Sequence, residues 1–227
     1  MGIQERRERE RAERKALIMR CARELILENG AEKVSMQDIA KKTELSKATL
    51  YLYFPGREEL FREICIELAV RFTEYVQARL SPGLSALEAL KLYWKSYVDL
   101  FGQSDDMILL FNMRRYLVPE YPFISIEEGP DSAAGPAYRF FNMIKYIIEQ
   151  GIAEGVFEPD TNAAMFSHTV LSLFSLIVEN AVKYSGDANS RTREDSNIID
   201  EMKSIFQIML RGIAREGIDR SLLVLGI

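Results

Sequence analysis

The stretch VSMQDIAKKTELSKATLYLYFPGREEL, residues Val34 to Leu60, decides the fold. Near its start, Ser35 is followed three residues later by Asp38. This spacing favours a helix that begins at Met36, because the serine hydroxyl accepts an unpaired backbone amide and the carboxylate suits the positive end of the helix dipole. The apolar residues of this helix share one side, which must pack against another element: Met36, Ile39 and Ala40.

A second short helix follows after a turn. Thr43-Glu44-Leu45 predicts the turn, and Ser46 stands where it can cap a helix over Lys47 to Tyr53. Leu50 and Phe54 are expected to face inward as its anchors. Two short helices joined by a turn of this length indicate a helix-turn-helix, whose second helix enters the major groove of DNA with its N-terminal residues toward the base edges.

The composition of the second helix suits a DNA-reading role. Lys47 and Thr49 offer hydrogen-bond donors, and Ala48 is small enough for close approach or for contact with a thymine methyl group. Arg57 begins the next helix, where its charge and the free backbone amides form a candidate phosphate site. The candidate DNA contacts are Ser35, Ser46, Lys47, Ala48, Thr49, Tyr51, Leu52, Tyr53 and Arg57.

Short segments at fixed spacing resemble the DNA-binding signature of TetR-type transcriptional regulators: Asp38-Ile39-Ala40, Leu45-Ser46-Lys47, Leu50-Tyr51, Tyr53-Phe54 and Arg57-Glu58-Glu59-Leu60. The resemblance covers roughly residues 15 to 62. Two positions depart from the family pattern. Glu44 stands where the family usually has a turn glycine, so a positive φ there is expected to cost about 1 kcal/mol. Arg57 replaces the usual Lys and keeps the charge. The alternative is that these helices are only packing units of an all-helical core.

The charge of the chain is unevenly distributed. The 227 residues are 48% apolar and 28% charged, which is usual for a globular protein, and the net charge is -5. Met1 to Arg57 carries 13 Lys and Arg against 9 Asp and Glu, or +4, which leaves -9 for the remainder. The basic end is therefore the end with the predicted helix-turn-helix, as nucleic-acid binding requires.

The two cysteines and the apolar stretches point to an intracellular protein. Cys21 and Cys65 lie among apolar residues without a CxxC or CxxH companion, so we expect two reduced core cysteines. A charged N-terminus predicts no signal peptide. The longest apolar stretch, Ala163 to Val178, is too short and too often interrupted by polar residues to span a membrane. We expect a cytoplasmic protein with no membrane partner.

The segment Gln4 to Lys15, QERRERERAERK, places acidic and basic residues at i, i+4 spacing. Each such pair adds only about 0.2–0.5 kcal/mol, yet together they favour a solvated helical extension. The alternative is an arginine-bearing arm that touches the minor groove or the DNA backbone. Beyond it, Leu17, Cys21 and Leu25 mark the expected core face of the first helix, which should end near Asn29-Gly30.

The remainder of the chain also has helical periodicity, so we predict an all-α fold in two parts. Residues 1–56, with a charged extension over 1–15, form a helix-turn-helix DNA-binding domain. Residues 57–227 form a helical effector-binding and dimerisation domain, joined through a long helix over 57–80. Further helices are predicted over Ser85 to Phe101, Met107 to Leu117, Ala137 to Glu154, Asp160 to Tyr184 and Arg193 to Gly217, with a proline-rich loop over Val118 to Pro136.

The last two long helices predict a partner surface. Asp160 to Tyr184 is apolar nearly all round, which indicates burial on more than one side. One chain does not have enough other helices to cover both this helix and the last long helix. In the resembled family the last two helices pair with their copies in a four-helix interface, so the resemblance implies a homodimer through these helices.

Bulky aromatic groups beside a few polar ones suggest a small-molecule site in the second part. The candidate effector contacts are Trp94, Tyr97, Phe111, Asn112, Phe140, Phe141 and His168. The alternative is that these aromatic residues simply fill the core. His168 also lines up with Ser172 and Ser175 on one helix face, which equally suits a hydrogen-bonded core or interface histidine.

Sequence motifs for catalysis are missing. There is one histidine, and there is no His/Cys cluster, GxSxG, P-loop or dinucleotide motif. We therefore expect no metal, no cofactor and no enzyme activity. The resemblance implies a repressor that binds a palindromic double-stranded DNA operator as a homodimer and is released by a small, largely apolar effector. The alternatives are an enzyme that uses the C-terminal helices, and a helical small-molecule carrier or interaction module without DNA binding.

Overall fold

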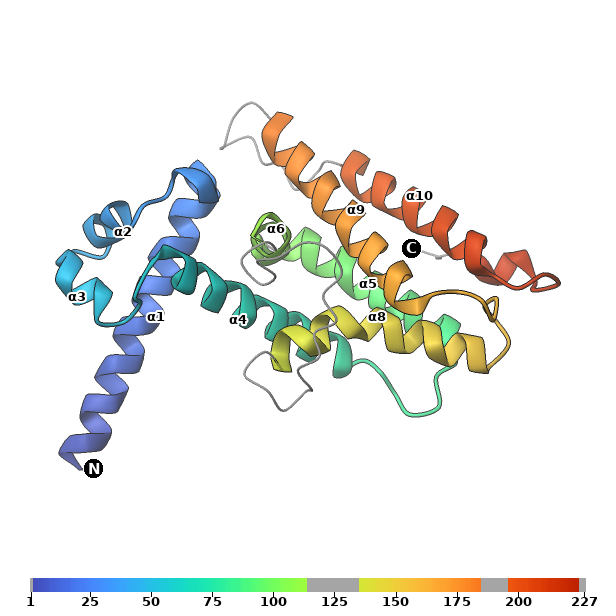
Figure 1. The fold of residues 1–227 in the computed structure, drawn as a ribbon, viewed down its shortest axis with the longest axis horizontal. Coiled ribbons are helices and arrows are strands. Elements are labelled where there is room, and N and C mark those ends of the chain that lie inside the picture. The colour runs from blue at the N-terminus through green and yellow to red at the C-terminus, as the bar shows by residue number, and fades with distance from the viewer. Residues whose placement is uncertain (1, 114–134, 185–195, 225–227) are drawn as a thin grey trace.

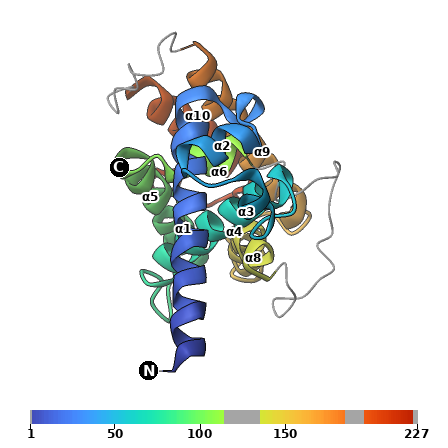
Figure 2. The same cartoon turned by 90° about the vertical axis from the view of Figure 1, so that its left-hand side faces the viewer.

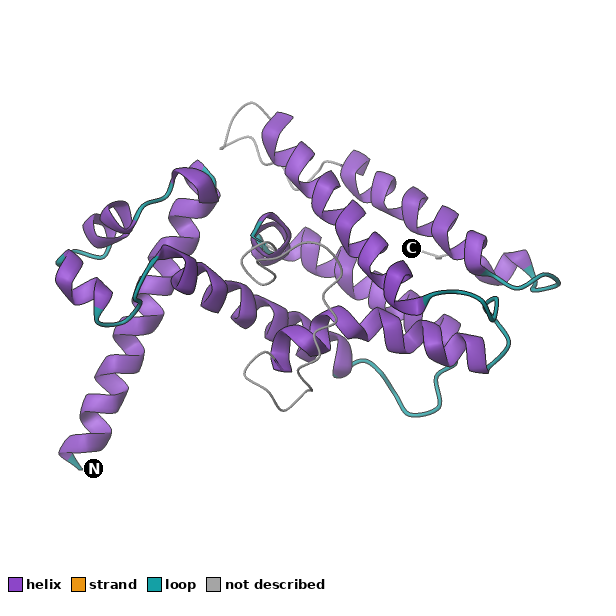
Figure 3. Ribbon diagram, viewed as in Figure 1, coloured by secondary structure: helices purple, strands orange, loops and turns teal. Residues whose placement is uncertain are grey.

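The computed structural model describes residues 2–113, 135–184 and 196–224. Within these ranges all regular structure is helical apart from one isolated bridge, and the predicted all-α fold is confirmed (Figure 3). In chain order the elements are α1 (Ile3–Asn29), η1 (Ala31–Lys33), α2 (Met36–Lys42), α3 (Lys47–Tyr51), α4 (Arg57–Gln77), α5 (Ala86–Gln103), α6 (Asp106–Asn112), α8 (Gly135–Ala153), α9 (Ala163–Tyr184), α10 (Ser196–Ile213) and η2 (Arg220–Leu223). A small N-terminal group, α1 to α3, and a larger group, α5 to α10, are joined by α4 (Figure 1).

The two short helices of the N-terminal group begin where the sequence predicts. Ser35 caps α2 and Ser46 caps α3, and each side chain accepts a hydrogen bond from the amide three residues further on. α3 ends at Tyr51 rather than at the predicted Tyr53, because the amide of Tyr53 donates to the carbonyl of Leu50 in a tighter turn. α2 packs against α1 and α3 packs against α2, and Figure 2 shows α2 in front of the C-terminal half of α1.

The buried face of α1 lies one residue further along than predicted. Leu17 and Leu25 are only half-buried, whereas Ile18 and Ala22 are fully buried. The buried face of α1 is wider than predicted, because α1 contacts both α2 and α4. Ala22, a small residue, lies within this face. The predicted end of the helix is correct, since α1 stops at Asn29 and Gly30 has a φ of 84°.

α4 touches both groups of helices. It starts at Arg57 as predicted and ends at Gln77, three residues before the predicted end, because the amides of Arg79 and Leu80 donate to carbonyls only three residues back in a tighter turn. Its neighbours are α1 on one side and α5, α6 and α8 on the other. The side chains that it buries follow the predicted stripe: Leu60, Phe61, Ile64, Cys65, Leu68, Phe72 and Val76.

Two bounds in the middle of the chain differ from the prediction. α6 ends at Asn112 with Met113 as its C-cap, and residues 114–117 of the predicted helix lie outside the described residues. α8 begins at Gly135, two residues before the predicted start. The predicted loop over Val118 to Pro136 also lies outside the described residues, apart from the first two residues of α8.

The last two long helices are shorter than predicted. α9 begins at Ala163 rather than Asp160, because Asn162 Oδ1 accepts a hydrogen bond from the amide of Met165 at 2.9 Å and so caps the helix. α10 ends at Ile213, since the next residue turns into the isolated bridge. α9 packs on α6 and α8, and α10 lies beside α9 along the outer edge of the larger group (Figure 1).

Phe157 ties the end of α8 to the end of α10. Its ring lies against Gly151, where any Cβ would overlap it, so only glycine fits there. Phe157 also forms the isolated antiparallel bridge with Ala214. Beside it, the amide of Glu158 donates to the carbonyl of Ile213 at 2.9 Å. The ends of α8 and α10 therefore share one junction.

Candidate nucleic-acid interface

The turn between α2 and α3 is strained at one residue. Glu44 has a φ of 56°, as its place in a tight turn predicts. An L-residue with a side chain pays roughly 1–2 kcal/mol for this left-handed conformation. The surrounding bonds hold it there: Thr43 Oγ1 donates to the carbonyl of Ile39 at 2.8 Å, and the amide of Leu45 donates to the carbonyl of Ala40 at 3.0 Å.

Four side chains stand out from α3 and its C-cap toward solvent, and together they are called the α3 outward face: Lys47, Ala48, Tyr51 and Leu52. Tyr51 is 50% exposed and Leu52 is 76% exposed. On the other side of the helix Leu50 and Phe54 are fully buried, as predicted. Large apolar groups left at a surface beside a cation mark a surface that binds another molecule.

The lysine of this face is already held by a neighbour. Lys47 Nζ donates to Gln37 Oε1 at 2.9 Å, which links the start of α3 to an exposed side chain of α2. Gln37 is absent from the contacts predicted from the sequence. The sequence pattern could have indicated Gln37, because it is a polar residue outside the buried side of α2 that Met36, Ile39 and Ala40 form. An amide and an ammonium side by side can each read a base edge.

Most of the predicted hydroxyl contacts work inside the protein as caps. Ser35 Oγ donates to Asp38 Oδ2 at 2.5 Å, and this bond lowers the pKa of the Asp38 carboxyl. Ser46 Oγ accepts from the amide of Thr49 at 3.0 Å and lies 2.8 Å from the Thr49 hydroxyl. Tyr53 is half-buried and packs on the core. These side chains position α2 and α3, whatever further contacts they make.

Arg57 is occupied within the protein. Its Nη1 donates to the carbonyls of Glu32 and Val34, both at 3.4 Å, and its Nη2 pairs with Glu58 Oε1 at 3.0 Å. The guanidinium also lies over the Phe61 ring, 5.7 Å from its centroid. Arg57 therefore fastens the start of α4 to η1, and a phosphate would have to compete with these partners.

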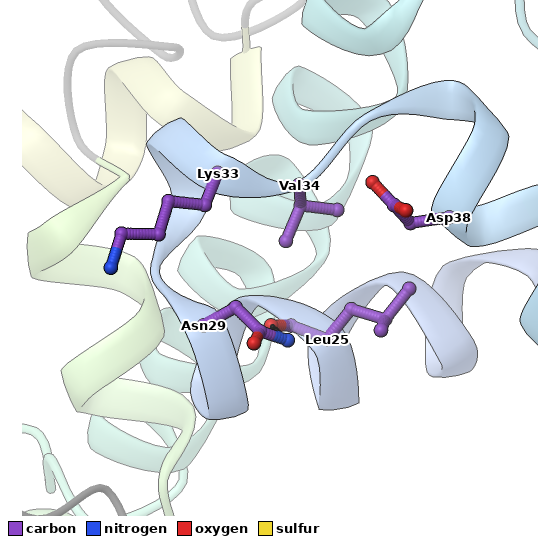
Figure 4. Close-up of a pocket in the computed structure, with 5 residues that line it drawn as sticks. All are labelled: Leu25, Asn29, Lys33, Val34 and Asp38. Carbon is purple, nitrogen blue, oxygen red and sulfur yellow. Dashed lines mark hydrogen bonds between the residues drawn. The ribbon is translucent and has the colours of Figure 1, made fainter.

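A shallow pocket of about 190 Å³ lies between α1, η1 and α2 (Figure 4). Leu25, Asn29, Lys33, Val34 and Asp38 line it. Two of its polar side chains have partners in the protein, since Asn29 Nδ2 donates to the Leu25 carbonyl at 3.2 Å and Asp38 caps α2. Figure 4 shows Lys33 pointing away from the other four side chains. The pocket is a surface depression that belongs to the packing of the N-terminal group.

Four of the predicted effector contacts belong to one aromatic cluster. Trp94 and Tyr97 stack at 5.4 Å between ring centroids, and Phe111 meets Tyr97 edge-on at 5.4 Å. Phe140 is equally buried and reaches the cluster through Phe72. His168 is half-buried on α9. The side chains of Asn112 and Phe141, in α6 and α8, lie outside the described residues.

Several polar atoms within this core have no hydrogen-bond partner among the described residues. They are Thr73 Oγ1, Tyr93 OH, Trp94 Nε1, Ser96 Oγ, Tyr97 OH and Ser172 Oγ. Burial raises the pKa of the Tyr93 and Tyr97 phenols, so both remain protonated donors at any ordinary pH. An unpaired buried polar group costs about 1–3 kcal/mol. The rings of this core pack closely, and the described residues leave these polar groups without partners.

The described residues contain no group of three or more His, Cys, Asp or Glu side chains that could hold a metal ion. Cys21 and Cys65 are buried free thiols, as predicted, and burial raises the pKa of both. Within the same ranges of the chain, no helix is long and apolar enough to cross a membrane.

A helix-turn-helix with a capped second helix and an exposed outward face, carried on a helical body, defines a DNA-binding transcriptional regulator. Residues 18–64 match the model of the bacterial regulatory proteins of the tetR family, and this match covers the helix-turn-helix. The structural resemblance extends over most of the chain, well beyond this segment.

Three relatives illustrate that extent. The uncharacterised HTH-type transcriptional regulator YvdT of Bacillus subtilis (strain 168) is 23% identical over 198 residues, which cover 86% of this chain and 93% of that protein. The fatty acid degradation regulator FadR from Bacillus halodurans superposes with a TM-score of 0.63 at 17% identity, covering 88% and 95% of the two chains. FadR from Bacillus subtilis in complex with stearoyl-CoA gives a TM-score of 0.61 at 18% identity, covering 87% and 98%.

Proposed function

We propose that the protein is a transcriptional repressor that binds a palindromic DNA operator as a homodimer and releases it when a small, largely apolar effector binds. The α3 outward face carries this proposal: Lys47, Ala48, Tyr51 and Leu52 are exposed while Leu50 and Phe54 anchor the helix. In this scheme residues 1–56 read DNA, and residues 57–227 bind the effector and the partner subunit. The protein acts in the cytoplasm, where the operator is, and has no catalytic role.

The length of α3 supports a dimeric complex. A helix of five residues reaches too few base pairs to select one site, so two copies on a palindrome are needed. In each half-site Lys47, with Gln37 beside it, faces base edges, and Tyr53 and Arg57 contact phosphates at the flank. Arg57 must exchange its bond to the Val34 carbonyl for a phosphate oxygen.

An exposed apolar stripe on α9 and α10 supports the homodimer. Met165 is 51% exposed and Leu176, three turns further along α9, is 52% exposed. Ile208 on the neighbouring α10 is 70% exposed. Stable interfaces bury about 800 Å² per partner around an apolar centre, and two long helices side by side provide such a surface. A second copy of the same helices covers the stripe in the proposed dimer.

The unpaired polar atoms of the aromatic core support an effector site there. Trp94 Nε1 can only donate a hydrogen bond, and the hydroxyls of Tyr93 and Tyr97 are protonated donors. An effector with an apolar body could pack against the aromatic rings of this core, and an acceptor such as a carbonyl oxygen could bind these donors. The stearoyl-CoA bound by the Bacillus subtilis FadR similarly joins an apolar chain to polar groups.

Ion pairs along α4 offer a route between the two sites. Glu67 of α4 pairs with Arg23 of α1 and, at 2.7 Å, with Arg71 one turn further on. Arg71 in turn pairs with Asp106 of α6 at 3.2 Å. Because α4 is bound to the DNA-reading group and to the effector group at once, a tilt of α4 changes the separation of the two α3 helices in the dimer.

The experiment is selection of bound duplexes from random DNA with the full-length protein, followed by gel shifts with the selected duplex. We expect an inverted repeat. A dimeric protein that enriches no sequence contradicts operator binding and favours the second candidate, a helical carrier. A thermal-shift screen then supplies effectors, which should weaken operator binding about 5- to 150-fold. A compound that binds tightly and leaves operator affinity unchanged contradicts the coupling.

A further inference from the structure

We propose that the free N-terminal part of α1 is a second DNA-binding surface, which contacts the phosphate backbone beside the half-site that α3 reads. The contact is made by Arg7, Arg11 and Arg14, called here the arginine stripe. The inference rests on the proposed DNA-binding function and adds a contact outside the helix-turn-helix. Its partner is the sequence-independent backbone of duplex DNA.

The arginine stripe lies on one side of the helix. Residues four and three apart share a face, because each residue turns the helix by about 100°. The next residues in the same series are Ile18 and Ala22, which are fully buried against the rest of the N-terminal group. The stripe therefore continues the inward side of α1 and points to the side of the axis on which α2, α3 and α4 lie.

The position of Lys15 shows where the free part of α1 begins. Lys15 Nζ pairs with Glu63 of α4 at 2.5 Å and lies 5.4 Å from the centroid of the Phe54 ring, just after α3. Beyond this level the helix projects past α3, on the same side of the molecule and away from α9 and α10 (Figure 1). Its twelve residues, Ile3 to Arg14, span about 18 Å, which matches about five base pairs of duplex.

The acidic residues of the extension neutralise the opposite side. Arg6 pairs with Glu10 at 2.8 Å and Arg9 pairs with Glu13 at 3.6 Å. The three arginines of the stripe are exposed, and no ion pair joins them to another described residue. Guanidinium groups in a row and free of carboxylates are complementary to phosphates, which they bind in a bidentate manner.

The test compares two variants that each remove three positive charges from α1. The first is R7Q/R11Q/R14Q. The control is R6Q/R9Q/R20Q, whose three exposed arginines share the opposite side of the same helix. The probe is the duplex selected by the wild-type protein, with ten flanking base pairs on each side, titrated over a range of salt concentrations. Circular dichroism of both variants checks that α1 stays helical.

We expect the stripe variant to bind with a slope of log affinity against log salt that is shallower by about 2–3 for each bound protomer, since each lost phosphate contact contributes about 0.9. Its sequence preference should match that of the wild type, and the control should keep the wild-type slope. A duplex without flanks should abolish the difference between wild type and the stripe variant.

Two results overturn the inference while operator binding stands: an unchanged slope in the stripe variant, or an equal change in the stripe variant and the control. Loss of helicity in the stripe variant alone, with R7K/R11K/R14K restoring both helix and slope, also supports the charge-based contact. A wild-type protein that selects no duplex removes the proposed function itself, and this contact with it.

Discussion

Lys47 Nζ and Gln37 Oε1 are joined by a hydrogen bond of 2.9 Å, so the first residue of α3 is oriented by an exposed side chain of α2. Lys47→Ala should weaken operator binding by about 1–3 kcal/mol and relax the preference at one base pair. Gln37→Ala should have a smaller effect in the same direction, because it frees the lysine without removing it. Competition titrations with single-base operator variants measure both, and additive effects in the double variant would show that the pair does not act as a unit.

Because Glu44 has a positive φ, replacing it with glycine should stabilise the folded protein. Glu44→Gly should raise the free energy of unfolding by about 0.5–1 kcal/mol, because relief of the left-handed strain exceeds the extra entropy of glycine in the unfolded chain. Glu44→Ala keeps the Cβ and serves as the control, with no gain expected. Thermal and urea unfolding report the change. A lower stability for the glycine variant would mean that the turn is not strained.

A negative charge on the apolar stripe of α9 and α10 should separate the subunits. Leu176→Glu and Ile208→Glu suit this test better than changes at Leu173 or Ile205, which are half-buried and would also disturb the monomer. Ile3→Glu places the same charge on an equally exposed apolar residue far from the stripe. Sedimentation at micromolar concentration should show monomers for the first two variants and dimers for the control and the wild type. A monomeric wild type contradicts the proposed interface.

Tyr97→Phe separates an effector contact from a packing role. The ring is kept, and a buried hydroxyl that has no partner among the described residues is removed, so thermal stability should stay the same or rise. If the hydroxyl donates to the effector, the concentration of effector needed to release the operator should increase by about 10-fold or more. Calorimetric titration with a hit from the thermal-shift screen provides the affinity. Equal affinity in both proteins would remove Tyr97 from the site.

The cap of α2 should make stability depend on acidity. Its hydrogen bonds with Ser35 lower the pKa of Asp38 below its ordinary 3.8. A carboxyl whose pKa is lower in the folded state stabilises the fold above its unfolded pKa, and this contribution disappears as the pH falls through the folded pKa. Asp38→Asn should therefore melt earlier than the wild type at pH 7, and the two melting temperatures should converge as the pH falls through the lowered pKa of Asp38. Glu201→Gln, an exposed carboxylate elsewhere, should show no such convergence.

Local signals made the helix-turn-helix predictable. Ser35 and Ser46 mark helix starts through bonds that span only three residues, and the short Thr43-Glu44-Leu45 segment between the two helices predicts the turn. The buried stripe of α4 follows from periodicity alone. In each case the residues that decide the structure are close neighbours in the chain, so no knowledge of the tertiary fold is needed.

Contacts between distant segments were not predictable in the same way. Arg57 satisfies the carbonyls of Glu32 and Val34, which are more than twenty residues away, and only the fold brings them together. The link between Lys47 and Gln37 depends on the angle of the turn. The buried face of α1 includes Ile18, which was not predicted, because α2 and α4 both pack on this helix. The sequence indicated which aromatic residues lie near Trp94. It did not predict the close stacking of the Trp94 ring on Tyr97 and Phe206.

The junction at Phe157 has a genetic consequence. Any side chain at position 151 must displace the Phe157 ring, and the bridge to Ala214 passes that displacement to the end of α10. For the proposed repressor, substitutions of Gly151 should thus appear in the same phenotypic class as substitutions of Ile208 in a random-mutation screen for loss of repression. Their carriers should resemble assembly mutants although residue 151 lies in α8, and second-site revertants that shrink Phe157 to Leu or Ala should restore repression.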